Sequence, residues 1–156
     1  QYLIVVDCFS RFFEVAKLTS TTPEGVIEHC KSIFARHGIP ERLRSDNGPQ
    51  FATDSFRRFA QEWCFSHETS SPNFPQSNWE AERAVRTVKN LLKKAGDPYL
   101  SLMAYRSAPL ANGFSPTELL MGRRIRTTVP VTQSQVTSKT INVEKPRTVE
   151  NNYRQK

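Results

Sequence analysis

Sulfur and imidazole side chains are scarce in this sequence. Its 156 residues include three cysteines and three histidines. The cysteines are odd in number and form no Cys-x-x-Cys unit, which indicates a reducing compartment rather than a disulfide framework. The histidines lack the paired spacing of a zinc site. These absences argue against a secreted disulfide-rich protein and against a zinc site built from Cys and His.

Long apolar stretches are also missing. No apolar run approaches the roughly 20 residues that a membrane helix needs, and the first residues show no charged-then-apolar leader. We therefore expect no membrane partner and no secretion. With 37% hydrophobic residues, the chain is expected to bury one modest core, so a single domain is the first expectation.

Acidic residues are few toward the C-terminal end. Residues 1–122 contain 14 Lys and Arg against 13 Asp and Glu, whereas residues 123–156 contain 8 against 2. The net charge of +7 therefore belongs mainly to the tail, and a basic tail suggests a polyanionic partner. Because the tail is poor in large apolar side chains, we predict a domain over 1–127 and a disordered tail or linker over 128–156.

The first third of the chain has clear strand and helix signals. Residues 3–7 form an apolar run typical of a buried strand, and residues 12–18 alternate well enough to pair with it as a hairpin. A helix should follow, because Thr22 is a capping residue, Pro23 suits the first helical position and Gly38 suits its end. Its predicted apolar face contains Val26, Ile27, Cys30, Ile33 and Phe34.

Two more strands with a helix between them are predicted next. Residues 40–46 predict a short strand that Asn-Gly-Pro at 47–49 breaks, and residues 65–70 predict another. Between them a helix should begin near Thr53. Strands that alternate with helices indicate an α/β sheet, in which ligand sites gather at the carboxyl ends of strands. Asp46 lies at such an end. The inward residues of the helix should be Phe56, Phe59, Ala60 and Trp63.

An irregular loop at 71–77 precedes a predicted helix at 78–94. Ser77 and Glu80 have the spacing of a capping box, which gives Glu80 a structural role and leaves Glu82 available for chemistry. Along the helix, Glu82, Arg86, Lys89 and Lys93 fall on one stripe. The stripe could contact a DNA backbone, or it could be a solvated face with an ion pair between Glu82 and Arg86.

Two acids with their flanking residues carry a resemblance to a known family. Asp46 ends Arg-Leu-Arg-Ser-Asp at 42–46, and Glu82 follows Pro-Gln-Ser-Asn-Trp-Glu-Ala at 75–81, with 35 residues between the acids. Each acid alone would be interpreted as a turn former or a solvated helix residue. Together with residues 45–51 and 115–124, they resemble the last two carboxylates of DDE integrase cores, in particular those of gypsy-type LTR retrotransposons.

The resemblance implies an RNase H-like α/β fold, with a mixed sheet flanked by helices. It implies that Asp46 and Glu82 are catalytic and bind Mg²⁺ or Mn²⁺, hard ions that prefer carboxylate oxygens. The reaction would be DNA integration by 3′-end processing and strand transfer through a two-metal site. The implied partners are DNA, as element ends and target, and further copies of the chain, with no small-molecule substrate. The implied localisation is nuclear.

The first acid of the family is not among these residues. Val-Val-Asp-Cys-Phe-Ser-Arg at 5–11 resembles the second strand of gypsy-type enzymes, whose Asp is not the metal ligand. On that alignment the fold lacks its first strand here, and the first acid lies before Gln1, so we expect this fragment to be inactive. The alternative is that Asp7 itself is the first acid. We favour a turn role for Asp7, which is common for Asp at strand ends.

The loop before Glu82 would meet the DNA substrate. In the family this loop contacts DNA, which implies DNA-binding roles for Gln76, Ser77 and Asn78. Trp79 departs from the pattern, because the family has Gly there. A bulky ring at this position favours a domesticated or decayed copy that binds DNA or protein without catalysis, although it could also stack on a base. A nuclease that hydrolyses DNA through the same metal site is a third reading.

Overall fold

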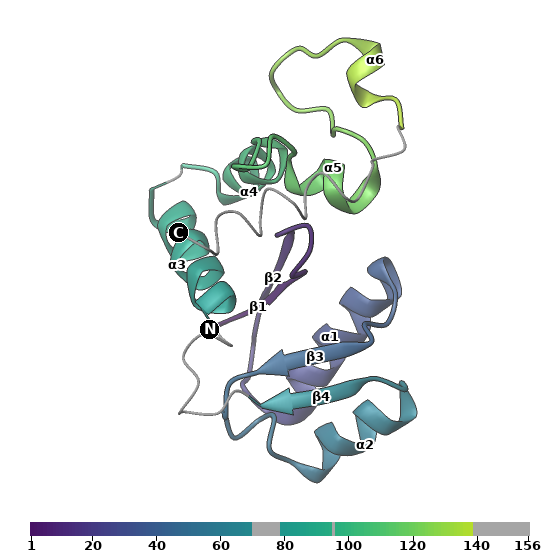
Figure 1. Cartoon of the computed structure of the whole chain (residues 1–156). Helices are drawn as coiled ribbons and strands as arrows, with labels where there is room; N and C mark the ends of the chain where they lie inside the picture. Colours follow the sequence, from purple (N-terminus) through teal and green to yellow (C-terminus); the bar gives the residue numbers. More distant parts are fainter. Residues whose placement is uncertain (70–78, 95, 139–156) are drawn as a thin grey trace. The chain divides into compact units, whose positions relative to one another are not determined.

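The computed structural model describes residues 1–69, 79–94 and 96–138, without the side chains at 79–81 and 92–94 (Figure 1). The chain divides into two compact units. The first contains Gln1–Val6 and Phe13–Val85, and the second contains Asp7–Phe12 and Arg86–Lys156. The described strands all lie in the first unit, together with helices, and the described elements of the second unit are helical.

The first unit begins with the predicted hairpin. Strand β1 (Tyr2–Val6) pairs antiparallel with β2 (Phe13–Lys17), in a register that places Ile4 opposite Val15. In the connecting segment, which belongs to the second unit, one carboxylate oxygen of Asp7 accepts hydrogen bonds from the amide of Ser10 at 2.7 Å and its hydroxyl at 2.6 Å. Asp7 therefore has the turn role that the sequence favoured.

Helix α1 (Pro23–His37) follows the predicted boundaries. The Thr22 hydroxyl accepts a hydrogen bond from the Gly25 amide at 3.3 Å, and Pro23 opens the first turn. Gly38 ends the helix with a φ of 91°, a left-handed value that glycine adopts without a steric penalty. The five residues predicted for its apolar face are its buried residues.

A β-α-β unit completes the first part of the fold. Strand β3 (Arg42–Ser45) pairs in parallel with β4 (Ser66–Thr69), and helix α2 (Asp54–Glu62) connects them. The hydroxyl of Thr53 caps α2 by accepting from the Phe56 amide at 3.2 Å. In Figure 1 the two strands lie side by side with α2 next to them.

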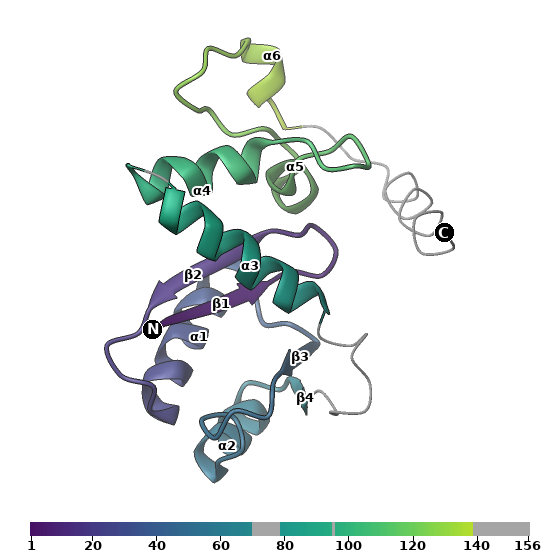
Figure 2. The same cartoon turned by 90° about the vertical axis from the view of Figure 1, so that its left-hand side faces the viewer.

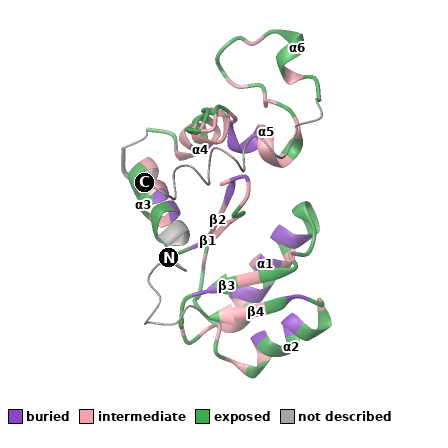
Figure 3. Cartoon of the chain, in the orientation of Figure 1, coloured by how far each residue is buried: buried purple, intermediate pink, exposed green. Residues whose placement is uncertain are grey.

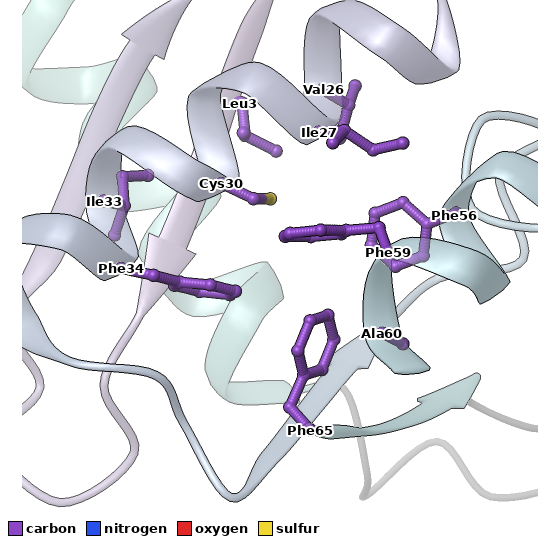
Figure 4. Close-up of a cluster of buried hydrophobic side chains, with 10 residues drawn as sticks. All are labelled: Leu3, Val26, Ile27, Cys30, Ile33, Phe34, Phe56, Phe59, Ala60 and Phe65. Atoms are coloured by element: carbon purple, nitrogen blue, oxygen red, sulfur yellow. The ribbon is translucent and has the colours of Figure 1, made fainter. Parts of the chain in front are cut away.

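Aromatic side chains dominate the core of this unit (Figure 4). The ring of Phe59 stacks on Phe34 at a centroid distance of 6.0 Å and meets Phe65 edge-on at 5.1 Å. Burial of one such ring contributes about 2–3 kcal/mol before the entropy cost of ordering. The buried faces of α1 and α2 are also evident in Figure 3. The cluster contains Leu3, Val26, Ile27, Cys30, Ile33, Phe34, Phe56, Phe59, Ala60 and Phe65.

The strands form two pairs rather than the single mixed sheet that we expected. Within the described residues, β1 and β2 make one two-stranded sheet, and β3 and β4 make another. Both strand orientations are present, so the α/β class with mixed pairing is confirmed. Leu3 of β1 and Phe65, just before β4, belong to one cluster with α1, which runs along the first pair in Figure 2. Side-chain packing, and not a shared hydrogen-bond ladder, therefore connects the pairs.

The described elements of the second unit are helices. Helix α3 (Trp79–Lys94) begins in the first unit, and its second half belongs to the second. Helices α4 (Pro98–Ser107) and α5 (Pro116–Met121) follow, and then a short α6 (Gln133–Val136). The Thr117 hydroxyl of α5 donates to the Arg106 carbonyl of α4 at 3.0 Å. None of the described helices is long and apolar enough to cross a membrane. The predicted tail of 128–156 lies outside the described residues from 139 onward.

Candidate catalytic site

Asp46 directly follows the carboxyl end of β3 and is exposed to solvent. Its Oδ1 accepts a hydrogen bond from the Gly48 amide at 3.0 Å, and the Phe51 amide donates to the Gly48 carbonyl at 3.0 Å. A Cβ at position 48 would lie 2.9 Å from Asp46 Oδ1. A side chain at position 48 would therefore crowd the carboxylate, which lies close to the backbone here.

The residue before Asp46 has a partner on the neighbouring strand. Ser45 is buried, and its hydroxyl donates to the Asp46 carbonyl at 2.8 Å and lies 2.9 Å from Nε2 of His67. Burial lowers the pKa of His67, because desolvation disfavours the imidazolium form. The sequence did not single out His67 as a site residue. The sequence predicted strands at 40–46 and 65–70 but not how they pair. Their parallel register is what places His67 near Ser45.

Glu82 lies in the first half of α3 and is exposed, as are Arg86 and Lys89 further along the helix. Their spacing places these three side chains on one face, as predicted. The side chain of Lys93 and residues Gln76, Ser77 and Asn78 lie outside the description. The predicted capping box of Ser77 and Glu80 also falls there. Helix α3 begins at Trp79.

Asp46 and Glu82 belong to the same unit. Among the described side chains, no three from His, Cys, Asp and Glu come together as a metal site. The meeting of the two carboxylates therefore stays a prediction. Both are carboxylates with access to water, and this donor chemistry suits Mg²⁺, which usually takes one or two protein carboxylates and keeps several waters.

The outer face of the parallel pair carries a separate set of charges. Glu68 on β4 forms ion pairs with Arg42 at 3.2 Å and with Arg44 at 3.0 Å, both on β3. Side chains alternate along a strand, so these residues share one face, and Leu43, Ser45 and His67 share the other. All three charged side chains are well exposed, so each pair adds little to stability. The inner face reaches Asp46 through its backbone, because the Ser45 hydroxyl donates to the Asp46 carbonyl.

Known proteins are similar to this chain in sequence. Residues 1–75 match the family described as the integrase core domain. The protein K02A2.6 of Caenorhabditis elegans is 36% identical over 137 residues, which is 81% of this chain and 11% of that protein. The Gag-Pro-Pol polyprotein of mouse mammary tumor virus is 33% identical over 99 residues, which is 62% of this chain and 6% of the polyprotein. The chain thus spans about a tenth or less of these relatives.

Solved structures are similar in fold. A chain of the simian T-cell lymphotropic virus intasome has a TM-score of 0.68 at 22% identity, with 87% of this chain and 53% of that chain covered. The catalytic core domain of BIV integrase has a TM-score of 0.65 at 24% identity, with 76% and 83% covered. The HTLV-2 integrase core, solved with magnesium in a trimeric form, has a TM-score of 0.61 at 20% identity, with 76% and 84% covered.

Proposed function

Since the chain belongs to the integrase core domain family of retroviral and retroelement Pol polyproteins, we propose that it forms the catalytic core of a gypsy-type LTR retrotransposon integrase. The observation that carries the proposal is the position of Asp46. It lies at the carboxyl end of a parallel strand, with its carboxylate fixed by the Gly48 amide. The motifs at 5–11 and 45–51 support the gypsy-type assignment.

The proposed reaction is transfer of a DNA 3′ end. In the first step, water attacks a phosphorus near the 3′ end of the element and the bond from that phosphorus to the 3′ oxygen breaks. The element strand keeps a 3′-OH, and the short terminal piece leaves with a 5′-phosphate. In the second, that 3′-OH attacks a phosphorus of target DNA, and the bond to the target 3′ oxygen breaks. Divalent ions, when bound, activate the attacking oxygen and stabilise the leaving one. Asp46 and Glu82 would hold them, and neither residue forms a covalent bond with DNA.

The third carboxylate is proposed to come from a strand outside this sequence. In the described part of the chain, the antiparallel and parallel pairs share no hydrogen-bond ladder. A further strand between β1 and β3 would join them into one mixed sheet, and the family resemblance assigns the first Asp to such a strand. In this proposal residues 1–127 are a partial core that is inactive alone, and 128–156 are a tail or linker.

DNA is the proposed partner of α3. Arg86 and Lys89 are exposed on the same helix as Glu82 and could neutralise phosphates near the metal site. We extend the proposal to Lys93 and to Gln76, Ser77 and Asn78, whose roles rest on the resemblance. Phosphate contacts of this kind position DNA without reading its sequence. A nuclear location follows from the proposed substrate.

Assembly into an oligomer is also proposed. Helix α4 exposes Tyr99 (80%) and Leu100 (46%), which are adjacent apolar residues. Similar proteins have been solved as an intasome and as a trimeric form of the core. A second copy that covers these residues would bury apolar surface, which is the main driving force of association.

A strand-transfer assay tests the proposed reaction. The protein should be extended upstream of Gln1 and supplied with Mg²⁺ or Mn²⁺ and paired element ends. We expect Asp46→Asn and Glu82→Gln to reduce joining to background. Asp54→Asn is the matched control, because Asp54 is an exposed acid that pairs with Arg57 at 2.8 Å on α2. Equal activity of Asp46→Asn and the parent protein would remove Asp46 from the mechanism.

A non-catalytic DNA- or protein-binding module is the second candidate. The observation that favours it is Trp79 at the first residue of α3, where the resembling family has Gly. In this case the extended protein would bind DNA but not join it, with or without Asp46→Asn. Trp79→Gly would then separate the two candidates, because recovery of joining would show that only the ring blocks the site.

A further inference from the structure

His67 lies against both ends of the turn that carries Asp46. At one end, Nε2 of His67 lies 2.9 Å from the hydroxyl of Ser45, the last residue of β3. At the other end, the ring of Phe51 lies 6.3 Å from the imidazole, measured between centroids. Gly48 connects the two ends of the turn by hydrogen bonds, since its amide donates to the Asp46 carboxylate and its carbonyl accepts from the Phe51 amide.

The hydrogen bonds fix which imidazole nitrogen carries the proton. The hydroxyl of Ser45 has a single hydrogen, which it donates to the Asp46 carbonyl at 2.8 Å. The contact at 2.9 Å therefore requires His67 to donate from Nε2 to the Ser45 oxygen. The imidazole donates to Ser45, and Ser45 donates to the backbone of Asp46.

Packing holds the imidazole in place. Its centroid lies 4.8 Å from that of Phe56, which is fully buried, and Phe56 also meets Phe51 edge-on at 5.2 Å. Burial lowers the pKa of His67, which favours the neutral ring, and a neutral ring packs against these aromatic rings without the cost of a buried charge. The parallel register places Leu43 opposite His67, so the ring and Ser45 share the inner face of the pair.

We propose that His67 is a positioning residue for Asp46: its Nε2–H group and its ring hold the two ends of the 46–51 turn, so that the carboxylate keeps one orientation. The benefit of that orientation for metal binding rests on the proposed function of Asp46. The role of His67 in holding the turn does not depend on that function. A carboxylate that is already oriented loses less conformational freedom when a divalent ion binds. His67 would not touch the ion or the DNA.

Two substitutions separate the hydrogen bond from the packing. His67→Gln places an amide N–H near the position of Nε2, so it should keep the bond to Ser45. His67→Leu keeps an apolar side chain against Phe51 and Phe56 but removes the donor. His29→Leu is the matched control, because it makes the same change at a histidine of α1, away from β4 and the 46–51 turn in the sequence. Far-UV circular dichroism and urea unfolding would show that each 156-residue variant folds.

The first readout is the turn itself, measured by NMR without any metal. We expect ¹⁵N spectra of the parent chain to show His67 protonated on Nε2. We expect the Gly48 amide to exchange with water about tenfold faster in His67→Leu, a loss of about 1.4 kcal/mol of local order, and near the parent rate in His67→Gln and His29→Leu. A proton on Nδ1, or an unchanged Gly48 rate in His67→Leu, would overturn the proposal.

The second readout is Mn²⁺, added to the same samples. Paramagnetic broadening of the Asp46 and Gly48 amides should require several-fold more Mn²⁺ in His67→Leu than in the parent or in His67→Gln. Equal Mn²⁺ requirements in all variants would overturn the positioning role. If the parent, and a version extended upstream, show no broadening at these amides, the metal function of Asp46 fails, and the Gly48 exchange rates still decide whether His67 holds the turn.

Discussion

At the residue scale, the environment of each thiol decides its chemistry. Cys30 is only 1% exposed within α1, and burial raises its pKa to about 11. Cys8 and Cys64 are exposed. Because the thiolate is the reactive form, two thiols of the folded chain should react with a disulfide reagent at pH 8 and the third should react only after unfolding.

A thiol titration with and without urea measures this difference. Cys64→Ala should remove one fast thiol and leave the slow one, which shows that the slow thiol is not Cys64. Three fast thiols in the folded parent chain would contradict the burial of Cys30.

Gly48 gives a second prediction at this scale. A methyl group there would lie 2.9 Å from Asp46 Oδ1 and 2.4 Å from Nε2 of the Gln50 side chain. The Gln50 side chain can move, but the carboxylate can do so only by giving up the Gly48 amide. We expect Gly48→Ala to cost about 1–2 kcal/mol in urea unfolding.

Gly96→Ala is the matched control, since a Cβ at Gly96 meets nothing within 4 Å. It should be neutral or stabilising by up to about 1 kcal/mol, because alanine reduces the entropy of the unfolded chain. Equal effects of the two substitutions would contradict the close approach of backbone and carboxylate at position 48.

At the element scale, the starts of α1 and α2 and the end of α1 could be predicted from nearby residues. Thr22, Pro23 and Gly38 act within one or two turns, so their roles in α1 could be predicted without the rest of the fold. The same holds for Thr53 in α2. The role of His67 could not be predicted, because it depends on the parallel register of β4 against β3, which brings His67 to Ser45, 22 positions earlier in the chain.

Helix α5 shows how one acid can stabilise an element. Glu118 accepts hydrogen bonds from the Ser115 amide at 2.9 Å and from Arg124 at 2.9 Å. Burial alone would raise the pKa of Glu118, but the Ser115 amide, Arg124 and the Ser115 hydroxyl together outweigh it and lower the pKa. The stability from ionised Glu118 is therefore present above its ordinary value of 4.5 and is lost as the pH falls through the lowered folded value.

Glu118→Gln tests this sign. Gln keeps an acceptor for the capping box but cannot ionise, so the variant should lose about 1–2 kcal/mol at pH 7. It should also lose less further stability than the parent between pH 5 and pH 2. Urea unfolding at several pH values measures both effects. Identical pH profiles for parent and variant would show that the carboxylate of Glu118 does not contribute.

At the scale of the whole molecule, the sequence predicted the α/β class but not its division into strand pairs. Alternating strands and helices are visible in a pattern of apolar residues. The pairing of strands depends on partners distant in the sequence, and the described residues contain two separate ladders. For the site, the sequence located Asp46 at a strand end, as the structure has it. The closeness of Asp46 to Glu82 depends on residues beyond local signals and remains a prediction.

The last prediction concerns assembly through α4. Tyr99 and Leu100 expose apolar surface that a second copy could cover. We expect Tyr99→Glu with Leu100→Glu to weaken self-association at least tenfold, because each charge would lose water at the contact. Arg58→Gln with Gln61→Glu is the matched control, since it changes the net charge by the same amount at exposed positions of α2. Sedimentation velocity over a range of concentrations measures both pairs. Equal association of the two double variants would place the contact elsewhere, whereas selective loss in the α4 variant would identify α4 as the surface on which copies of this integrase core meet.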